Sequence, residues 1–336
     1  MARLLVVAPN WIGDALMCQP LLMRLREKLP QARIDVMASA WVAPVFRRMP
    51  EVAGVIETPF AHGALQLRER WRLGRTLKAL GYDQALVLPN AWKAALVPLF
   101  AGIAVRSGYL GESRYGLLNR VHRKQPGREP MALHYARLSA APGAPVAQPL
   151  PDPKLAVDAQ AALATRRRFG LEERYAVLCP GAEYGPAKRW PYFPELAARL
   201  DLPVVALGSA QERALCAALG GRNLAGETTL DEALDVLAGA ALVVSNDSGL
   251  MHLAAALGRP QVALYGSSSP RHTPPLSERA RVVWLGIECS PCYARECPLG
   301  HFRCMKELSV EQVLAILGTD SIFPKRSDGK MGSVPS

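Results

Sequence analysis

Residues 241–265 read ALVVSNDSGLMHLAAALGRPQVALY and contain one complete strand–helix–strand unit. The short apolar run over 241–245 is typical of a strand that is buried on both faces of a parallel sheet. Helical spacing follows over 249–257, and a second apolar strand is predicted over 261–265. Because a strand, a crossover helix and a parallel strand form the repeating unit of doubly wound domains, this stretch predicts an α/β fold.

The same alternation extends through most of the chain. Further strands are predicted over residues 4–8, 34–38, 54–57, 84–88, 175–179 and 203–207. Further helices are predicted over residues 14–29, 42–49, 65–80, 157–169, 192–200, 211–219, 230–238 and 310–317. Apolar runs that alternate with amphipathic segments indicate parallel sheets covered by helices.

A proline-rich stretch over residues 125–153 separates two such series. Seven prolines lie in it and the apolar periodicity disappears, which is typical of a linker between lobes. We therefore predict a first lobe with its linker over 1–150, a second lobe over 151–318, and a disordered polar tail over 319–336. Two doubly wound lobes place a cleft between the carboxyl ends of their sheets, where such sheets bind ligands.

The composition excludes several classes of protein. The 336-residue chain is 50% apolar and 21% charged, which excludes a wholly disordered chain. No apolar run is long enough to span a membrane, and the first residues lack a secretion signal, so we expect a cytoplasmic protein.

The charge is unevenly distributed along the chain. Residues 1–150 hold 20 basic and 9 acidic residues, whereas the remainder holds 20 of each, so the first lobe carries the whole net charge of +11. This asymmetry indicates an anionic partner, with a basic face kept for solubility as the alternative. Nucleic acid is the least favoured partner because the chain contains no recognised nucleic-acid-binding module.

The first predicted strand leads into a glycine and an acid. Gly13 lies at the strand-to-helix turn, where glycine permits a close approach of the backbone to a ligand. Asp14 opens the helix, where an aspartate can simply stabilise the helix N-terminus. At the carboxyl edge of a sheet the same side chain can act as a general base. Both interpretations are open on these residues alone.

A polar loop of the second lobe precedes the helix over 249–257. The free backbone N–H groups of Ser248, Gly249 and Leu250 at this helix start form an anion site of the kind that holds a diphosphate. Asp247 lies just before the site and His252 one helical turn beyond it. A capped helix with a buried histidine is the alternative.

Two more polar loops follow strands of the same lobe. One carries Lys188 and Arg189, which can neutralise a leaving phosphate or form an exposed basic loop. The other carries Ser209 and Glu212, which suit a ribose or base contact. Because parallel strands end at one edge of their sheet, the three loops together predict a nucleotide pocket.

These motifs resemble those of one known family. WIGD at 11–14, KRWP at 188–191, NDSGLMH at 246–252 and YGS at 265–267 are similar in order and spacing to the ADP-heptose:lipopolysaccharide heptosyltransferases. The resemblance covers nearly the whole chain and is closest to the branch that adds the second inner-core heptose. It implies an inverting GT-B glycosyltransferase of lipopolysaccharide core biosynthesis, part of Gram-negative outer-membrane biogenesis, that requires no cofactor or catalytic metal.

The resemblance also assigns roles to single residues. Asp14 matches the base that deprotonates the acceptor hydroxyl, and Lys188 matches a lysine that stabilises the donor diphosphate. The donor-binding set implied in this way is Gly13, Arg189, Ser209, Glu212, Asp247, Ser248, Gly249 and His252.

The partners implied are ADP-heptose and a phosphorylated lipid A–core acceptor, with peripheral contact at the cytoplasmic face of the inner membrane. The residues proposed to meet the acceptor or anionic lipid are Arg68, Arg70, Arg72, Arg75, Lys78, Arg106, Arg114, Arg120, Arg123 and Lys124. Heptosyltransferases with a different acceptor remain an alternative, as does a nucleotide-sugar-binding protein that performs no transfer.

Four of the seven cysteines lie close together near the end of the second lobe. Cys289, Cys292, Cys297 and Cys304 fall within 16 residues, and four thiolates at this spacing would be able to close a tetrahedral zinc site. Disulfides are not expected in a reducing compartment. Reduced cysteines that pack a loop are the simpler interpretation.

Overall fold

The computed structural model describes residues 1–61 and 63–318, so the predicted tail over 319–336 lies outside the described residues. Its first lobe contains β1 (Arg3–Val7), α1 (Ile12–Met17), α2 (Gln19–Lys28), β2 (Arg33–Ser39), α3 (Ala43–Arg47), β3 (Gly54–Thr58), α4 (Leu67–Lys78), β4 (Gln84–Val87), η1 (Trp92–Ala95), α5 (Leu96–Phe100), β5 (Val105–Tyr109), β6 (Arg120–His122), α6 (Met131–Ala136) and η2 (Arg137–Ser139).

The second lobe follows after an extended crossing segment. It contains α7 (Ala159–Arg168), β7 (Ala176–Cys179), η3 (Pro186–Lys188), α8 (Phe193–Ala198), β8 (Val204–Ala206), η4 (Ala210–Glu212), α9 (Arg213–Ala217), β9 (Arg222–Asn223), α10 (Leu230–Gly239), β10 (Leu242–Asn246), α11 (Gly249–Ala256), β11 (Gln261–Tyr265), β12 (Ala280–Trp284), α12 (Arg303–Lys306) and α13 (Val310–Gly318).

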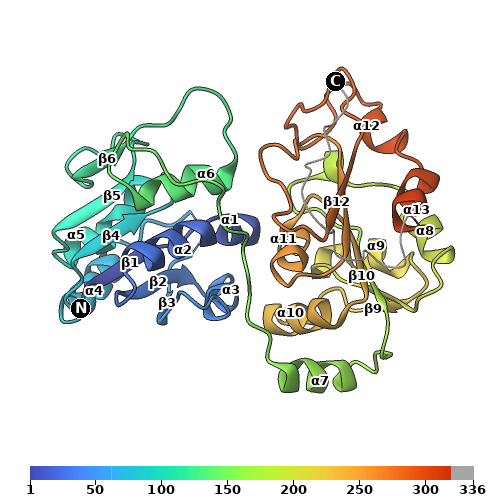
Figure 1. The fold of residues 1–336 in the computed structure, drawn as a ribbon, viewed down its shortest axis with the longest axis horizontal. Coiled ribbons are helices and arrows are strands. Elements are labelled where there is room, and N and C mark those ends of the chain that lie inside the picture. The colour runs from blue at the N-terminus through green and yellow to red at the C-terminus, as the bar shows by residue number, and fades with distance from the viewer. Residues whose placement is uncertain (62, 319–336) are drawn as a thin grey trace.

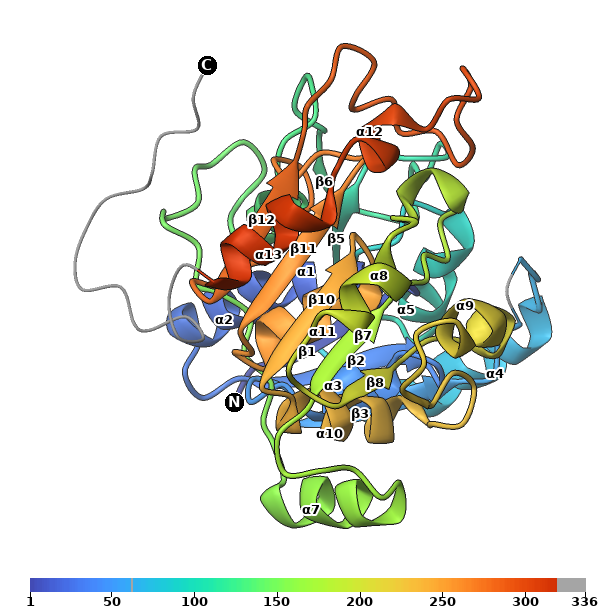
Figure 2. The ribbon, with the colours of Figure 1, turned by 90° about the vertical axis from the view of Figure 1, so that its right-hand side faces the viewer.

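Each lobe is built on a parallel sheet, which in the described residues has six strands. The strand orders are β3-β2-β1-β4-β5-β6 and β12-β11-β10-β7-β8-β9. The pairings are parallel throughout, and Val6 of β1 lies between Val36 of β2 and Leu86 of β4. Helices lie on both faces of each sheet (Figure 1), and in the second lobe α10 and α11 face the first lobe (Figures 1 and 2). The predicted α/β architecture of two doubly wound lobes is confirmed.

The central strands form because their side chains are buried on both faces. The last four residues of β1 and the whole of β10 are buried, as strands covered by helices on both sides require. Both strands then end at polar loops. Because all strands of a lobe run in one direction, these loops share one edge of each sheet.

The predicted helix over 14–29 is wrong, since it is divided into α1 and α2 at Cys18. Pro20 explains the division because it lacks an N–H donor and its ring clashes with a preceding helical turn. It is accommodated in the first turn of α2. The break leaves α1 as a short helix whose start carries Gly13 and Asp14.

The proline-rich stretch over 125–153 is not a linker throughout, which corrects the prediction made for it. It contains α6, which packs against α2 of the first lobe and buries Tyr135. Pro130 is the N-cap residue of this helix, directly before its first residue. The strands β5, β6, β9 and β12 were also not predicted. β6 and β9 are only three and two residues long, and β5 and β12 are partly exposed and each contains an arginine that interrupts the apolar run.

The two lobes meet along α1 and α11. A Cβ atom added at Gly249 would lie 3.0 Å from Ile12 Cβ, and one added at Gly13 would lie 2.9 Å from His252 Cδ2. The crossing segment is fixed to the body of the protein, since Leu155 N donates to Ala256 O at 3.0 Å. Glycine is therefore needed on both sides of this contact, directly beside Asp14.

A second contact between the lobes is an ion pair at Arg48. Its guanidinium lies 2.8 Å from Asp235 Oδ1 and 3.2 Å from Asp231 Oδ1 of α10. The Arg48 side chain is 13% exposed and that of Asp235 only 5%. Removing one partner of a buried pair leaves the other charge uncompensated in a poorly solvated site.

We expect Arg48→Ala to lower the free energy of unfolding by about 3 kcal/mol, because among the described residues Asp235 would then keep the Thr165 hydroxyl and no cation as its partner. Arg47→Ala is the matched control, since Arg47 pairs with Glu57 on the surface and should contribute less than about 1 kcal/mol. Urea unfolding followed by tryptophan fluorescence measures both. Equal losses in the two variants would contradict the structural role of Arg48.

Candidate active site

Asp14 lies in the first turn of α1, just beyond the carboxyl end of β1. The hydroxyl of Tyr135 from α6 donates a hydrogen bond to Asp14 Oδ1 at 3.2 Å. Burial raises the pKa of the Asp14 carboxyl above its ordinary value, and the Tyr135 hydrogen bond and the nearby His272 only partly oppose this rise. A carboxylate with a raised pKa is a stronger base, which suits it to take a proton from a hydroxyl.

Sequence reasoning missed two residues around Asp14. Tyr135 lies in the stretch without periodicity, and nothing in the sequence shows that α6 brings it to α1. His272 comes from the second lobe, where its Nδ1–H donates to the Glu129 carbonyl at 2.7 Å. The backbone N–H of Met131 donates to the His272 carbonyl at 3.0 Å. These bonds fix α6, and with it Tyr135, at the contact between the lobes.

Lys188 and Asp247 form an ion pair at the carboxyl edge of the second sheet. Lys188 Nζ, at the end of η3, lies 2.5 Å from Asp247 Oδ2, which follows β10 directly. The Ser268 hydroxyl donates to the same oxygen at 2.5 Å. Asp247 is 4% exposed and Lys188 is 15% exposed. An ammonium has three N–H donors, so Lys188 held in this way can also bind an anion.

The start of α11 lies beside this pair. Ser248 is the N-cap residue, and its side chain does not cap the helix but lies with Oγ 3.2 Å from Ser245 Oγ. The first backbone N–H groups of α11, from Gly249 onward, therefore retain the anion-binding character of a helix N-terminus. Lys188 and the helix start place positive potential at the carboxyl edge of the second sheet.

His252 lies one turn into α11 and is buried against Gly13. Burial lowers the pKa of His252 to about 4. The negative charge of Asp247 opposes this decrease, and the positive charge of Lys188 adds to it. The imidazole is therefore neutral at pH 7 and adds no positive charge for a diphosphate. The His252 side chain lies between the Lys188–Asp247 pair of the second lobe and the Gly13–Asp14 turn of the first lobe.

Asn246, the last residue of β10, fixes the loop that carries Lys188. Its Nδ2 donates to the Pro180 carbonyl at 2.8 Å, and its Oδ1 accepts the Trp190 N–H at 3.1 Å. Arg189 contacts the same loop through Nη2, which lies 3.5 Å from Ala182 O. The buried strand that precedes the predicted anion site thus also positions its lysine.

Ser209 and Glu212 form a capping box in the loop that follows β8. Glu212 Oε2 accepts hydrogen bonds from Ser209 N at 2.8 Å and Ser209 Oγ at 3.1 Å. The Glu212 carboxylate fills the space beside Gly181, where an added Cβ would lie 1.9 Å from Oε1. Both side chains thus build the loop, and their contact with a nucleotide stays a prediction.

Three of the arginines proposed to meet an anionic partner instead stabilise loops of the first lobe. Arg70 is buried and donates to Leu65 O at 2.6 Å, and Arg114 is buried and donates to Pro89 O at 2.5 Å. Arg106 donates to Leu117 O at 2.7 Å. Their role as partner contacts was wrong, because these donors are occupied by backbone carbonyls. Exposed cations remain at Arg68, Arg72, Arg75, Lys78, Arg120, Arg123 and Lys124.

Comparison with known proteins gives a consistent relationship over most of the chain. Residues 70–303 match glycosyltransferase family 9 (heptosyltransferase). Lipopolysaccharide heptosyltransferase 2 of Escherichia coli (strain K12) is 44% identical over 335 residues, covering 93% of this chain and 96% of that protein. Lipooligosaccharide heptosyltransferase 2 of Haemophilus influenzae is 40% identical over 314 residues, covering 84% and 88%.

The structure agrees with this relationship. The solved structure of E. coli ADP-heptose lps heptosyltransferase II superimposes with a TM-score of 0.83 at 43% identity, covering 94% of this chain and 97% of that one. The two lobes and the loops at their sheet edges define a GT-B glycosyltransferase. The chain belongs to glycosyltransferase family 9, the heptosyltransferases.

We expect Tyr135→Phe to move the acid limb of the pH–rate profile to higher pH. The Tyr135 hydroxyl lowers the pKa of Asp14, so its removal should raise that pKa further. A base works only when ionised, so with Asp14 as the base we expect transfer to be lost as the pH falls through this pKa. At the alkaline plateau the rate should change by less than about tenfold.

The measurement is kcat against pH for the wild type and the variant. Tyr175→Phe is the control, because its hydroxyl donates to Val236 O within the second lobe. The idea that Tyr135 tunes Asp14 fails if the acid limb of Tyr135→Phe coincides with that of the wild type.

Proposed function

We propose that this chain transfers L-glycero-D-manno-heptose from ADP-heptose to the first heptose of the lipopolysaccharide inner core, heptosyl-Kdo2-lipid A. The observation that carries the proposal is the 44% identity to lipopolysaccharide heptosyltransferase 2 of E. coli, which extends over nearly the whole of both chains. The arrangement of Asp14 and Lys188 on facing lobes supports it, because transfer needs a base and an anion-stabilising group on opposite sides of the reacting carbon.

In the proposed reaction Asp14 accepts the proton of the acceptor hydroxyl as its oxygen attacks the anomeric carbon of the donor. The bond from that carbon to the diphosphate oxygen breaks, and its electron pair leaves with ADP. Attack from the face opposite the leaving group inverts the anomeric centre. Lys188 and the N–H groups at the start of α11 stabilise the negative charge that develops on the diphosphate.

We propose that this electrostatic stabilisation replaces a divalent cation in catalysis. Lys188 is oriented by its ion pair with Asp247, and the Ser268 hydroxyl holds that carboxylate on its other side. The positive groups are thus in place before the leaving group departs, which is what preorganised stabilisation requires. Transfer should proceed in EDTA.

The acceptor decides between related activities. We expect transfer from ADP-heptose, with EDTA present, to a purified acceptor carrying one heptose and not to those carrying none or two, with product mass as the measurement. Reaction of the zero-heptose acceptor alone would assign the activity of a heptosyltransferase 1. Tight ADP-heptose binding without any product would favour a nucleotide-sugar-binding protein.

The lipid-linked acceptor also requires a place where the protein meets a membrane. Across the described residues no helix is long and apolar enough to cross a bilayer. We propose a peripheral cytoplasmic contact through the outer face of α4, defined by Leu67, Arg68, Trp71, Arg72, Arg75 and Lys78. At 100° per residue these six positions occupy roughly 140° of the helix circumference.

The chemistry of this face suits an anionic lipid surface. Leu67 and Trp71 are 50% and 51% exposed, and the four cations beside them are exposed as well. The opposite side of α4 is buried through Arg70, Gly74 and Leu77. Exposed tryptophan and leucine flanked by basic side chains are typical of interfacial helices that bind anionic headgroups.

Co-sedimentation with vesicles tests the membrane contact. Vesicles containing phosphatidylglycerol should bind the protein, and Arg68→Glu with Arg72→Glu should abolish binding. The double variant Arg199→Glu with Arg213→Glu makes the same charge change on the surface of the second lobe and should retain most of the vesicle binding. Equal losses in both pairs would show a general effect of net charge.

A further inference from the structure

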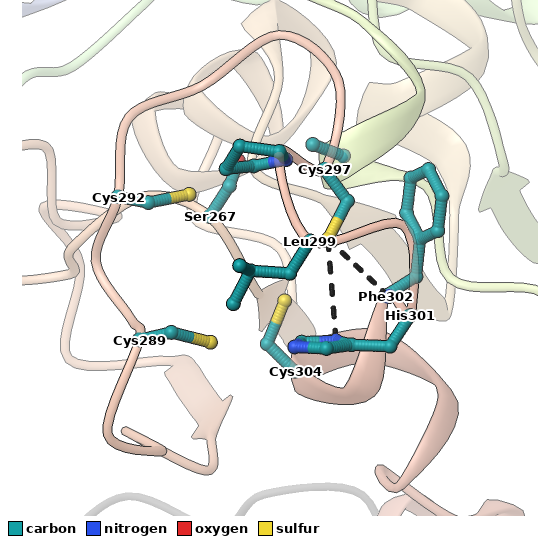
Figure 3. A pocket seen from close by; sticks show the side chains of 10 residues that line it. Ser267, Cys289, Cys292, Cys297, Leu299, His301, Phe302 and Cys304 are labelled. Atoms are coloured by element: carbon teal, nitrogen blue, oxygen red, sulfur yellow. Dashed lines mark hydrogen bonds between the residues drawn. The ribbon is translucent and has the colours of Figure 1, made fainter.

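The four clustered cysteines form one pocket in the second lobe. They lie in the segment that follows β12 and ends in α12, and their sulfur atoms turn toward the same small space (Figure 3). This cavity of about 40 Å³ is also lined by Ser267 and Leu299. All four are free thiols. Residues separated by up to 15 positions therefore present sulfur to a common point.

Backbone contacts fix the loop around one of these sulfurs. The backbone N–H of Phe302 donates to Cys297 Sγ at 3.4 Å. The neighbouring His301 is held by the Arg303 N–H, which donates to its Nδ1 at 3.0 Å. The four sulfurs can complete a tetrahedral set without the imidazole.

The spacing of the cysteines matches the chemistry of such a set. Cys289 and Cys292 have the Cys-x2-Cys spacing that recurs in structural zinc sites. Cys297 comes from the next turn of the loop, and Cys304 is held in α12. Soft thiolate ligands in a tetrahedral set select zinc or iron over hard cations.

Coordination requires the sulfurs to move closer together. Among the described residues, no three metal-ligating side chains already surround one point closely enough to hold an ion. The Leu299 side chain lies among the sulfurs (Figure 3) and would have to turn aside. The segment from Cys289 to Phe302 contains neither helix nor strand, so an adjustment there would break no helix or sheet hydrogen bonds.

We propose that Cys289, Cys292, Cys297 and Cys304 bind one thiolate-preferring divalent ion, such as zinc, and that this ion fastens the loop onto the donor site. The loop already contacts the segment that carries Lys188. Ala187 N donates to Arg295 O at 3.0 Å, and the Tyr184 hydroxyl donates to Tyr293 O at 2.5 Å. Tyr293 N donates to Ser267 O at 2.7 Å, next to the Asp247 partner Ser268.

Metal analysis of the full chain, purified without chelator, tests the site independently of transferase activity. We expect about one equivalent of zinc or iron per chain, as a closed tetrahedral site binds. Cys292→Ser and Cys297→Ser should each lose the ion, and Cys292 is exposed, so its replacement should not disturb the core. Cys216→Ala, which removes a buried thiol outside the cluster, should retain it.

Hydrogen exchange provides the second measurement. Removing the ion from the wild type with a strong chelator should speed amide exchange in the 289–302 loop and around Lys188, and adding zinc back should restore protection. The proposal is overturned if the chain binds no zinc when it is added and all four cysteines remain open to alkylation. A mass deficit that shows disulfides among the four would also overturn it.

Discussion

Asp14→Asn is expected to lower kcat by about 10²- to 10⁴-fold while donor affinity stays within about twofold of the wild type, because only the proton acceptor is lost. Asparagine has the same shape and can still accept the Tyr135 hydrogen bond, so the turn at Gly13 should be preserved. Its amide cannot take a proton from the acceptor hydroxyl. The measurement is the initial rate of transfer, with ADP-heptose binding followed by calorimetry.

The pH dependence strengthens this test. In the wild type the rate should fall as the pH drops through the raised pKa of Asp14, and therefore at a higher pH than an ordinary aspartate would give. Asp14→Asn should lose this acid limb because no group titrates at that position. Glu57→Gln neutralises an exposed carboxylate of the same lobe and should change neither rate nor profile. Transfer at the wild-type rate by Asp14→Asn would remove Asp14 as the base.

Lys188→Met is expected to lower kcat/KM for ADP-heptose by about 10²- to 10³-fold, the range found when one preorganised charge-stabilising donor is removed. The loss should appear in donor affinity and in kcat, because in the proposed reaction Lys188 faces the diphosphate, whose negative charge grows during transfer. Steady-state kinetics with donor varied at saturating acceptor separates the two. Arg199→Met, which removes an exposed cation of the same lobe, should have little effect.

A second variant separates this catalytic loss from a folding defect. Lys188→Met leaves the buried Asp247 without its cation, which should also lower stability by about 3 kcal/mol. Lys188→Met combined with Asp247→Asn removes both charges and should recover much of that stability without recovering transfer. Recovery of both together would mean that Lys188 serves the fold and not the donor.

The sequence predicted most of the sheet framework because buried parallel strands leave a strong signal. The strand over 261–265 is predicted at its observed bounds, and β1, β2, β4, β7 and β10 are predicted within one residue at either end. These strands consist of apolar residues on both faces, so their pattern does not depend on distant partners. Three of the four edge strands, β6, β9 and β12, were missed because an edge strand is only half buried and its pattern is weak, whereas the edge strand β3 was predicted. The inner strand β5 was also missed, because Arg106, Ser107 and Gly108 interrupt its apolar pattern.

Several candidate residues could be named in advance because they lie at strand ends, whose position in a parallel sheet follows from chain direction. Asp14 follows β1 and Asp247 follows β10, so both had to lie at cleft-facing edges of their sheets. The same argument could not distinguish basic side chains that are buried against the protein's own carbonyls from those that are exposed to a partner. Arg70 and Arg72 are two positions apart on α4, and only their contacts show that the first is buried against loop carbonyls while the second is exposed.

The sequence by itself determined two doubly wound lobes, the polar loops at their edges and the basic character of the first lobe. The tertiary structure alone decided that α6 forms within the proline-rich stretch and brings Tyr135 to Asp14, and that the Gly13 turn packs on His252. The physical reason is the separation along the chain of the residues that make these contacts. Periodicity records the burial of each segment, whereas these contacts join residues up to about 240 positions apart, whose approach depends on how the two lobes pack.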